Sequence, residues 1–291
     1  MTDHPPLSER ILTLVKHPQF YWWLGHVCLV LNAILYFTSV LSLHPYTGYY
    51  KRAHAGSLIS YGIVIWKSVG IPRRFDMEFI GNENVQYFAL AFYWYSYRPI
   101  TVTLVPFFIF SLFHMFAYIP SAITPVLFPK DSNSNSTVAQ ACQSIKEYTD
   151  EHHEMAMQLA AYVEVVGVMG QLLLGVISFQ TSILALIVFA HFLRLRYYLS
   201  PYTREALHET TEKLDQWILP LAHDPRRWAQ ISCKLYVNIK AIVIRYGSAT
   251  TTSHKNSNSN SSSNRSSRVT STGSGNGGGS SSRTSESSHR R

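Results

Sequence analysis

The chain has few of the residues from which disulfide-rich domains and most enzyme sites are built. Its 291 residues include three cysteines, Cys28, Cys142 and Cys233, an odd number at wide spacing. Such a set forms neither a disulfide framework nor a metal-ligand pair. The sequence also contains no nucleophile elbow, phosphate loop, dinucleotide fingerprint or kinase motif. These absences predict a protein with no enzymatic activity and no cofactor.

Charged residues are scarce as well, at 14% of the chain, and they are unevenly placed. Residues 248–291 are almost wholly Ser, Asn, Gly and Thr, with no aromatic residue, and six cationic residues against one glutamate. Such a segment cannot bury enough apolar surface to offset the entropy of ordering it, so a disordered basic tail is expected. The rest of the chain is only mildly basic, which argues against nucleic acid as a partner.

Long apolar runs are what the sequence does have. Residues 22–43, "WWLGHVCLVLNAILYFTSVLSL", contain no Asp, Glu, Lys or Arg. About 20 such residues match the hydrocarbon thickness of a bilayer, so a transmembrane helix is predicted here. Trp22 and Trp23 at its start are typical of a membrane boundary. Residues 1–21 ahead of it have the apolar spacing of a short interfacial helix.

The following apolar runs are shorter or interrupted. Residues 53–71 contain His54, Ser57, Ser60 and Lys67, which favours a short or shallow span. Residues 85–96 and 100–118 are separated by Arg98-Pro99 and predict a membrane hairpin whose first helix is too short to cross comfortably. Residues 157–199 divide at the "SFQTS" stretch into two spans of bilayer length.

These elements predict an all-α, multi-spanning membrane protein with short hairpins, a C-terminal amphipathic region and a disordered tail. The expected parts are residues 1–21, the interfacial helix; 22–120, the first span and short hairpins; 121–156, a polar loop and helix start; 157–199, a transmembrane hairpin; 200–247, the amphipathic region; and 248–291, the tail.

The last span ends in "FLRLRYYLSPY", where cationic and aromatic side chains alternate. Arg194 and Arg196 are predicted to meet water on the cytosolic side, and Tyr197 and Tyr198 to form an aromatic belt at the membrane boundary. Farther on, Trp228, Ile231, Leu235, Ile239, Ile242 and Tyr246 fall on one helical face, with Arg227, Lys234 and Arg245 beside it. This pattern is typical of a basic helix lying in a membrane surface, although a core helix of a small domain has the same pattern.

Few residues are candidates for chemistry. Glu164 is a carboxylate within an apolar run, which is typical of transporters and proton relays, but no basic residue lies at helical spacing from it. Adjacent His152 and His153 in "EHHE" point about 100° apart on a helix, so no metal site is predicted. His26, Asn32 and His114 are expected to hydrogen-bond between helices.

Several runs together resemble the transmembrane protein 33 family. They are "FSLFH" at residues 110–114 after Pro99 and Pro106, "FLRLRY" at 192–197 followed by Pro201-Tyr202, and "HPQFYWW" at the start of the first span. The resemblance covers approximately Leu7 to Tyr246 and leaves out the tail.

The resemblance implies a multi-pass protein of the endoplasmic reticulum and nuclear envelope without catalytic activity. Its relatives shape tubular membrane, associate with reticulon-type proteins and support nuclear pore distribution or assembly. In the fungal branch, a C-terminal amphipathic helix binds curved membrane and contacts an import receptor. The basic residues that match this segment are Arg226, Arg227, Lys234, Lys240 and Arg245.

Three functions follow as hypotheses. The first is a structural protein that shapes or senses curved membrane, contacts the lipid bilayer and nuclear pore components, and keeps both termini in the cytosol. The alternative is a channel, transporter or regulator of ion flux that uses Glu164. A membrane-embedded lipid enzyme rests only on the scattered histidines.

Overall fold

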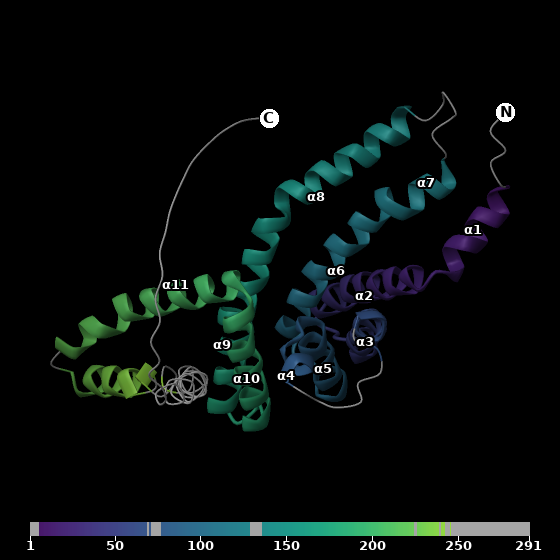
Figure 1. Cartoon of the computed structure of the whole chain (residues 1–291). Helices are drawn as coiled ribbons and strands as arrows, with labels where there is room; N and C mark the ends of the chain where they lie inside the picture. The colour runs from purple at the N-terminus through teal and green to yellow at the C-terminus, as the bar shows by residue number, and fades with distance from the viewer. Residues whose placement is uncertain are drawn as a thin grey trace, which may run out of the picture. The chain divides into compact units, whose positions relative to one another are not determined.

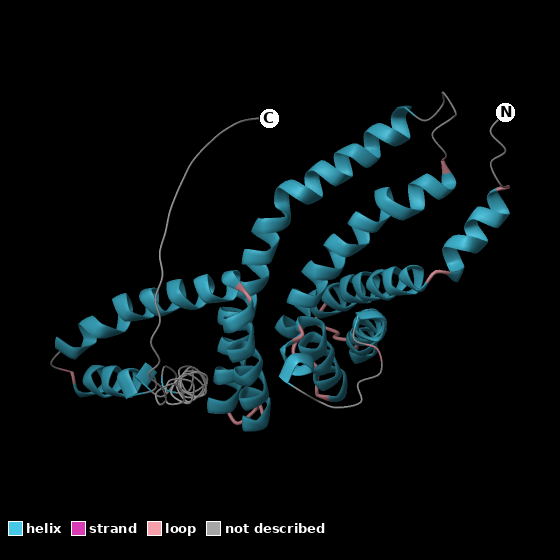
Figure 2. Ribbon diagram, viewed as in Figure 1, coloured by secondary structure: helices cyan, strands magenta, loops and turns pink. Residues whose placement is uncertain are grey.

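The computed structural model of the chain describes residues 6–68, 70, 77–128, 136–223, 226–238, 240, 241 and 245. Within these residues the secondary structure is helical and no strand occurs (Figures 1 and 2). The predicted all-α, multi-spanning class is therefore confirmed. The chain divides into two compact units, Met1–His223 and Asp224–Arg291. The predicted boundaries of the smaller parts stay a prediction, and the tail from residue 248 lies outside the described residues.

The described residues of the first unit form a series of helices. In chain order they are α1 (Leu7–Lys16), α2 (Pro18–Leu41), α3 (Thr47–Ser68), α4 (Met77–Gly81), α5 (Glu83–Ser96), η1 (Thr101–Thr103), α6 (Leu104–Tyr118), η2 (Ile119–Ile123), α7 (Thr124–Leu127), α8 (Ser136–Tyr162), η4 (Val163–Val168), α9 (Met169–Ile177), α10 (Ile183–Leu199), α11 (Pro201–Ile218) and η5 (Leu219–His223).

Side chains in the turns set where several helices begin. Nδ1 of His17 accepts a hydrogen bond from the Gln19 N–H at 3.3 Å, and Pro18 occupies the first turn of α2. The hydroxyl of Ser182 likewise accepts from the Leu184 N–H at the start of α10. Such caps satisfy donors that the first helical turn leaves unpaired, which is why α2 and α10 start at these positions.

Small residues let α2 and α3 pack closely. Gly25 and Gly56 face each other: a Cβ added to Gly56 would lie 2.6 Å from the Gly25 carbonyl oxygen. Ser60 adds a hydrogen bond from its hydroxyl to the Trp22 carbonyl at 2.9 Å. Close backbone approach through small residues and interhelical hydrogen bonds are the usual basis of helix packing in membranes.

Aromatic side chains fill the space between α3, α5, α6 and α10. Tyr61 stacks on Tyr87 with ring centroids 5.7 Å apart, and Phe107 and Phe192 meet the same Tyr87 ring edge-on. Trp94 of α5 is fully buried in the same core. The core therefore brings together helices from early and late parts of the unit, and it buries one face of α5.

Three helical stretches among the described residues are long and apolar enough to cross a membrane: Pro18–Leu41, Thr101–Leu127 and Thr137–Ile177. A fourth is possible if α10 and α11 count as one span, although they meet at a bend of 114°. Neither α3 nor the 14-residue α5 belongs to this set, in keeping with the short or shallow segments expected there.

The helix after α6 continues farther than the sequence indicates. A polar loop was expected from residue 121, whereas the helix runs through η2 and α7 to Leu127. Pro120 lies in the first turn of η2, which is a π-helix, and Pro125 lies in the first turn of α7, which is an α-helix. Each proline removes one backbone N–H donor. The Ser121 and Thr124 hydroxyls donate to the carbonyls of Ala117 and Ile119. The chain therefore stays helical past both prolines, with a change to π-helix in the segment that contains Pro120.

Candidate functional site

A cluster of charged and phenolic side chains lies inside the first unit. Glu83 and Tyr87 stand one turn apart on α5, Glu164 comes from η4 and Arg196 from α10. Nη1 of Arg196 donates to Oε1 of Glu83, and its guanidinium carbon lies 5.1 Å from the centre of the Tyr87 ring. The Tyr87 hydroxyl donates to Oε1 of Glu164 at 2.8 Å. One tyrosine thus connects the cation to the buried carboxylate.

Burying the charged side chains of this cluster costs free energy. Glu164 is 1% exposed and Arg196 is 5% exposed, whereas the side chain of Glu83 is about half exposed. A buried charge costs several kcal/mol unless a partner compensates it, and here Arg196 attracts both carboxylates. Oε2 of Glu164 and Nε of Arg196 have no hydrogen-bond partner among the residues described. The cluster therefore links α5, η4 and α10, and removing one member leaves another buried polar group without its partner.

The structure revises what the sequence indicates for Arg196 and Glu164. The expectation that the Arg196 side chain faces water is wrong, because it is enclosed between α5 and η4. Glu164 lacks a basic partner at helical spacing, yet a cation from α10 supplies one. Pairing between distant helices leaves no periodic signal in the sequence. That Arg196 lies near the membrane boundary stays a prediction.

The other residues that the sequence assigns to the membrane boundary differ from one another in burial and in contacts. The Trp22 ring centre lies 5.4 Å from that of His114 on α6, and Nε1 of Trp23 donates to the Met115 carbonyl of α6 at 3.2 Å. Both indoles therefore contribute to the contact between α2 and α6. Arg194 is partly buried, while Tyr197 and Tyr198 are exposed and meet edge-on at 5.5 Å. The exposed tyrosine pair is compatible with a membrane-facing belt, which remains a prediction.

The expected hydrogen bonds between helices are found for some of the histidine and asparagine side chains in the spans, but not for all of them. Nδ1 of His26 hydrogen-bonds with the Ser111 hydroxyl at 2.9 Å, which confirms a bond between α2 and α6. Asn32 instead donates to the Cys28 carbonyl within α2. His152 stacks on Tyr148, whereas His153 meets Phe113. No group of three or more His, Cys, Asp or Glu side chains suited to a metal ion occurs in the described part of the chain.

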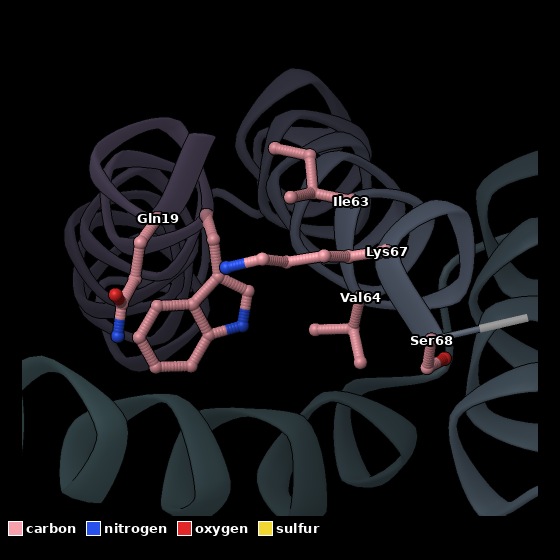
Figure 3. Close-up of a pocket in the computed structure, with 6 residues that line it drawn as sticks. Gln19, Ile63, Val64, Lys67 and Ser68 are labelled. Atoms are coloured by element: carbon pink, nitrogen blue, oxygen red, sulfur yellow. The ribbon is translucent and has the colours of Figure 1, made fainter. Parts of the chain in front are cut away.

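A hollow of about 400 Å³ opens between the start of α2 and the end of α3. It is lined by Gln19, Trp22, Ile63, Val64, Lys67 and Ser68. Figure 3 shows the Lys67 side chain extending from α3 across the hollow toward the helix that carries Gln19. A long cationic side chain at the end of an apolar helix commonly reaches toward lipid headgroups.

The second unit contains a helix with an exposed apolar stripe, at residues 227–238. Trp228, Ile231 and Leu235 are 56%, 60% and 58% exposed, and they recur at the spacing of one helical face. Arg227 and Lys234 are exposed as well, and the Arg226 guanidinium carbon lies 5.9 Å from the Trp228 ring centre. An alternating set of cations and exposed apolar side chains suits a membrane surface.

The remaining residues that the sequence assigns to this membrane surface lie after the helix at residues 227–238. Lys240 is partly buried and Arg245 is exposed. The side chains of Ile239, Ile242 and Tyr246 lie outside the described residues. The alternative of a core helix finds support on the opposite face, because Ala229 and Cys233 are buried. The membrane-surface assignment of all eleven residues therefore stays a prediction.

The fold and these surfaces define a multi-spanning helical membrane protein. The family model described as Transmembrane protein 33/Nucleoporin POM33 matches residues 7–248. The chain belongs to this family, so the resemblance seen in the sequence is confirmed.

Several relatives align over most of their length. Tetra-spanning protein 1 of Schizosaccharomyces pombe is 30% identical over 226 residues, covering 73% of this chain and 80% of the relative. The Pore membrane protein of 33 kDa of Saccharomyces cerevisiae is 25% identical over 226 residues, covering 72% and 78%. The Pore and endoplasmic reticulum protein of 33 kDa from the same yeast is 24% identical over 238 residues, covering 73% and 86%. No solved structure matches the chain significantly.

Proposed function

We propose that this chain is a non-enzymatic membrane protein of the endoplasmic reticulum and nuclear envelope that shapes or senses curved membrane. It would thereby support the distribution or assembly of nuclear pores and the organisation of tubular reticulum. Two of its relatives are named as a pore-membrane protein and as a pore and endoplasmic reticulum protein, and neither name describes an enzyme. A nucleoporin-like membrane role is accordingly the function that the family supports best.

The exposed stripe of Trp228, Ile231 and Leu235 is the single observation that carries the curvature proposal. Large apolar side chains are rarely left together on the surface of a soluble unit. A helix of this type inserts its apolar face at the boundary between headgroups and acyl chains, while its cations face anionic lipid. Insertion into one leaflet widens that leaflet, so binding favours membrane that is already curved.

Two features of the first unit support the same proposal. The 14-residue α5 is too short to span about 30 Å of hydrocarbon at 1.5 Å per residue. The α10 and α11 helices bend by 114° at Ser200-Pro201, which turns the chain away from the direction of α10. Segments that enter a bilayer without crossing it occupy one leaflet more than the other.

The specific protein partners of the chain are also proposals. We infer reticulon-type membrane proteins and nuclear pore components as partners of the membrane region, with both termini in the cytosol. An import receptor is proposed for the basic residues of the second unit, because acidic protein surfaces attract exposed cations such as Arg226 and Arg227.

A peptide of residues 224–247 tests the curvature proposal through its binding to small and large liposomes of one composition. The expected result is tighter binding to the small liposomes, lost when Trp228, Ile231 and Leu235 are all replaced by Ser. The matched control is Asn238→Ser, which changes an exposed polar residue on the same helix and is expected to leave binding unchanged. Equal binding to both sizes would contradict the proposal.

An ion-flux function using Glu164 is the second candidate, and one observation favours it: Oε2 of this buried carboxylate has no partner among the described residues. A Glu164→Gln variant in proteoliposomes tests it directly. Flux that requires the carboxylate would fall in the variant. No flux in the native protein, or equal flux in both, would remove this candidate and leave Glu164 with a structural role.

A further inference from the structure

A second hollow, of about 520 Å³, lies where α1 meets the start of α2 and the helix that continues α6. This volume falls within the roughly 300–1,000 Å³ of small-molecule sites. Polar side chains line it from α1 and the turn before α2, and apolar ones from the opposite side. The lining includes Glu9, Arg10, Thr13, Leu14, His17, Tyr118 and Val126.

Arg10 provides an unused cationic donor in this hollow. Its Nε and Nη1 atoms are buried, and neither has a hydrogen-bond partner within the described residues. A buried donor without an acceptor is costly, and the planar guanidinium matches the oxygens of a phosphate particularly well. The arrangement therefore suits a phosphate group that comes from outside the chain.

Glu9 lines the same hollow with the opposite charge. No ion pair joins Glu9 to Arg10, although the two residues are neighbours in α1. A purely anionic ligand would be repelled by the Glu9 carboxylate. A ligand that carries both a phosphate and an amine would be attracted by both side chains.

Two further side chains add donors or acceptors at this position. Nδ1 of His17 accepts from the Gln19 N–H, so the neutral ring carries its proton on Nε2, where it can donate. The Thr13 hydroxyl donates to the Glu9 carbonyl at 2.9 Å and retains an oxygen that can accept. Both groups suit the polar part of a headgroup.

Neighbouring aromatic residues indicate that the hollow lies at the level of lipid headgroups. The Trp23 ring stacks on Tyr118 with centroids 5.6 Å apart, and Trp and Tyr are concentrated at membrane interfaces. Val126 and Leu14 supply apolar surface beside the polar groups, as an acyl chain requires. We propose that this hollow binds a zwitterionic phospholipid, with its phosphate at Arg10 and its ammonium at Glu9. The site is independent of the curvature proposal, because it uses none of the residues of the second unit.

Native mass spectrometry of the full-length protein in detergent tests the site. The protein is exposed to equal amounts of phosphatidylethanolamine and phosphatidylglycerol, and the lipid that stays bound is counted. The native chain is expected to retain phosphatidylethanolamine preferentially. Arg10→Gln is expected to lower its retention about tenfold, equivalent to about 1.4 kcal/mol. Glu9→Gln is expected to remove the preference and to raise binding of phosphatidylglycerol.

Lys16→Gln is the matched control, since Lys16 is an exposed cation of α1 that does not line the hollow. It should retain both lipids as the native chain does, and Arg10→Lys should fall between the native chain and Arg10→Gln. Equal retention of the two lipids by the native chain would overturn the proposal, as would equal losses in Lys16→Gln and Arg10→Gln. If Arg10→Gln fails to fold, an unchanged lipid preference in Glu9→Gln would overturn it.

Discussion

The two units of the chain place the same kinds of side chain in opposite environments. In the first unit, Arg196 lies between aromatic residues but is enclosed by protein and paired with Glu83. In the second unit, Arg227 and Lys234 also lie next to aromatic and aliphatic residues, but both cations and their neighbours Trp228 and Leu235 are exposed. The two stretches look alike in the sequence. The comparison shows that alternating cations and aromatic residues can either lie in the interior of a membrane protein or be exposed on its surface.

Arg196→Met has the largest expected effect on stability. It removes the cation that compensates Glu164 and leaves that carboxylate buried, which costs about 3–5 kcal/mol. The thermal unfolding midpoint in detergent should fall markedly, whereas Arg227→Met in the second unit should change stability by no more than about 0.5 kcal/mol. The double variant Arg196→Met, Glu164→Gln should recover part of the loss. Equal effects of the two arginine substitutions would remove the distinction between the units.

Tyr87→Phe has the next largest expected effect. The ring and its stacking on Tyr61 stay in place, but Oε1 of Glu164 loses the hydroxyl donor at 2.8 Å. Leaving a buried acceptor unpaired costs about 1–3 kcal/mol. Tyr197→Phe removes an exposed hydroxyl and serves as the control. Identical unfolding midpoints for the two variants would contradict a structural role for the Tyr87 hydroxyl.

Gly56→Ala tests the apolar packing of the first unit in the same assay. The added methyl would meet backbone atoms of Gly25 and Leu29, at 2.6 and 2.9 Å, and backbone cannot move as easily as a side chain. Overpacking of this kind costs about 1–3 kcal/mol. Gly170→Ala meets nothing within 4 Å and should stabilise its helix by up to about 1 kcal/mol. Effects of the same sign at both glycines would contradict the close α2–α3 contact.

Arg227→Gln with Lys234→Gln should have the smallest effect on stability, because both side chains are exposed. Its effect should appear in lipid binding, where each cation near an anionic surface contributes about 1 kcal/mol. Binding of the 224–247 peptide to anionic liposomes should weaken and lose much of its salt dependence. Unchanged binding would show that these cations do not face lipid.

Much of the fold follows from the sequence because it depends on local pattern. The span at Pro18–Leu41 has the length and composition of a transmembrane helix, and Trp228, Ile231 and Leu235 recur at helical spacing. The continuation of the helix past Pro120 was missed, because a proline in a first turn resembles a helix end in sequence alone. The Glu83–Arg196 pair was missed as well, since it joins helices far apart in the chain. Local periodicity carries no information about such contacts.

The location of a fluorescently tagged full-length chain, compared with a version that ends before Arg226, tests the central claim most directly. The claim is that the second unit contacts the membrane at nuclear pores while the first unit anchors the protein. A punctate nuclear rim that becomes an even reticulum pattern on truncation is the predicted result. The same punctate rim in both versions would contradict the claim and assign the location to the membrane region alone.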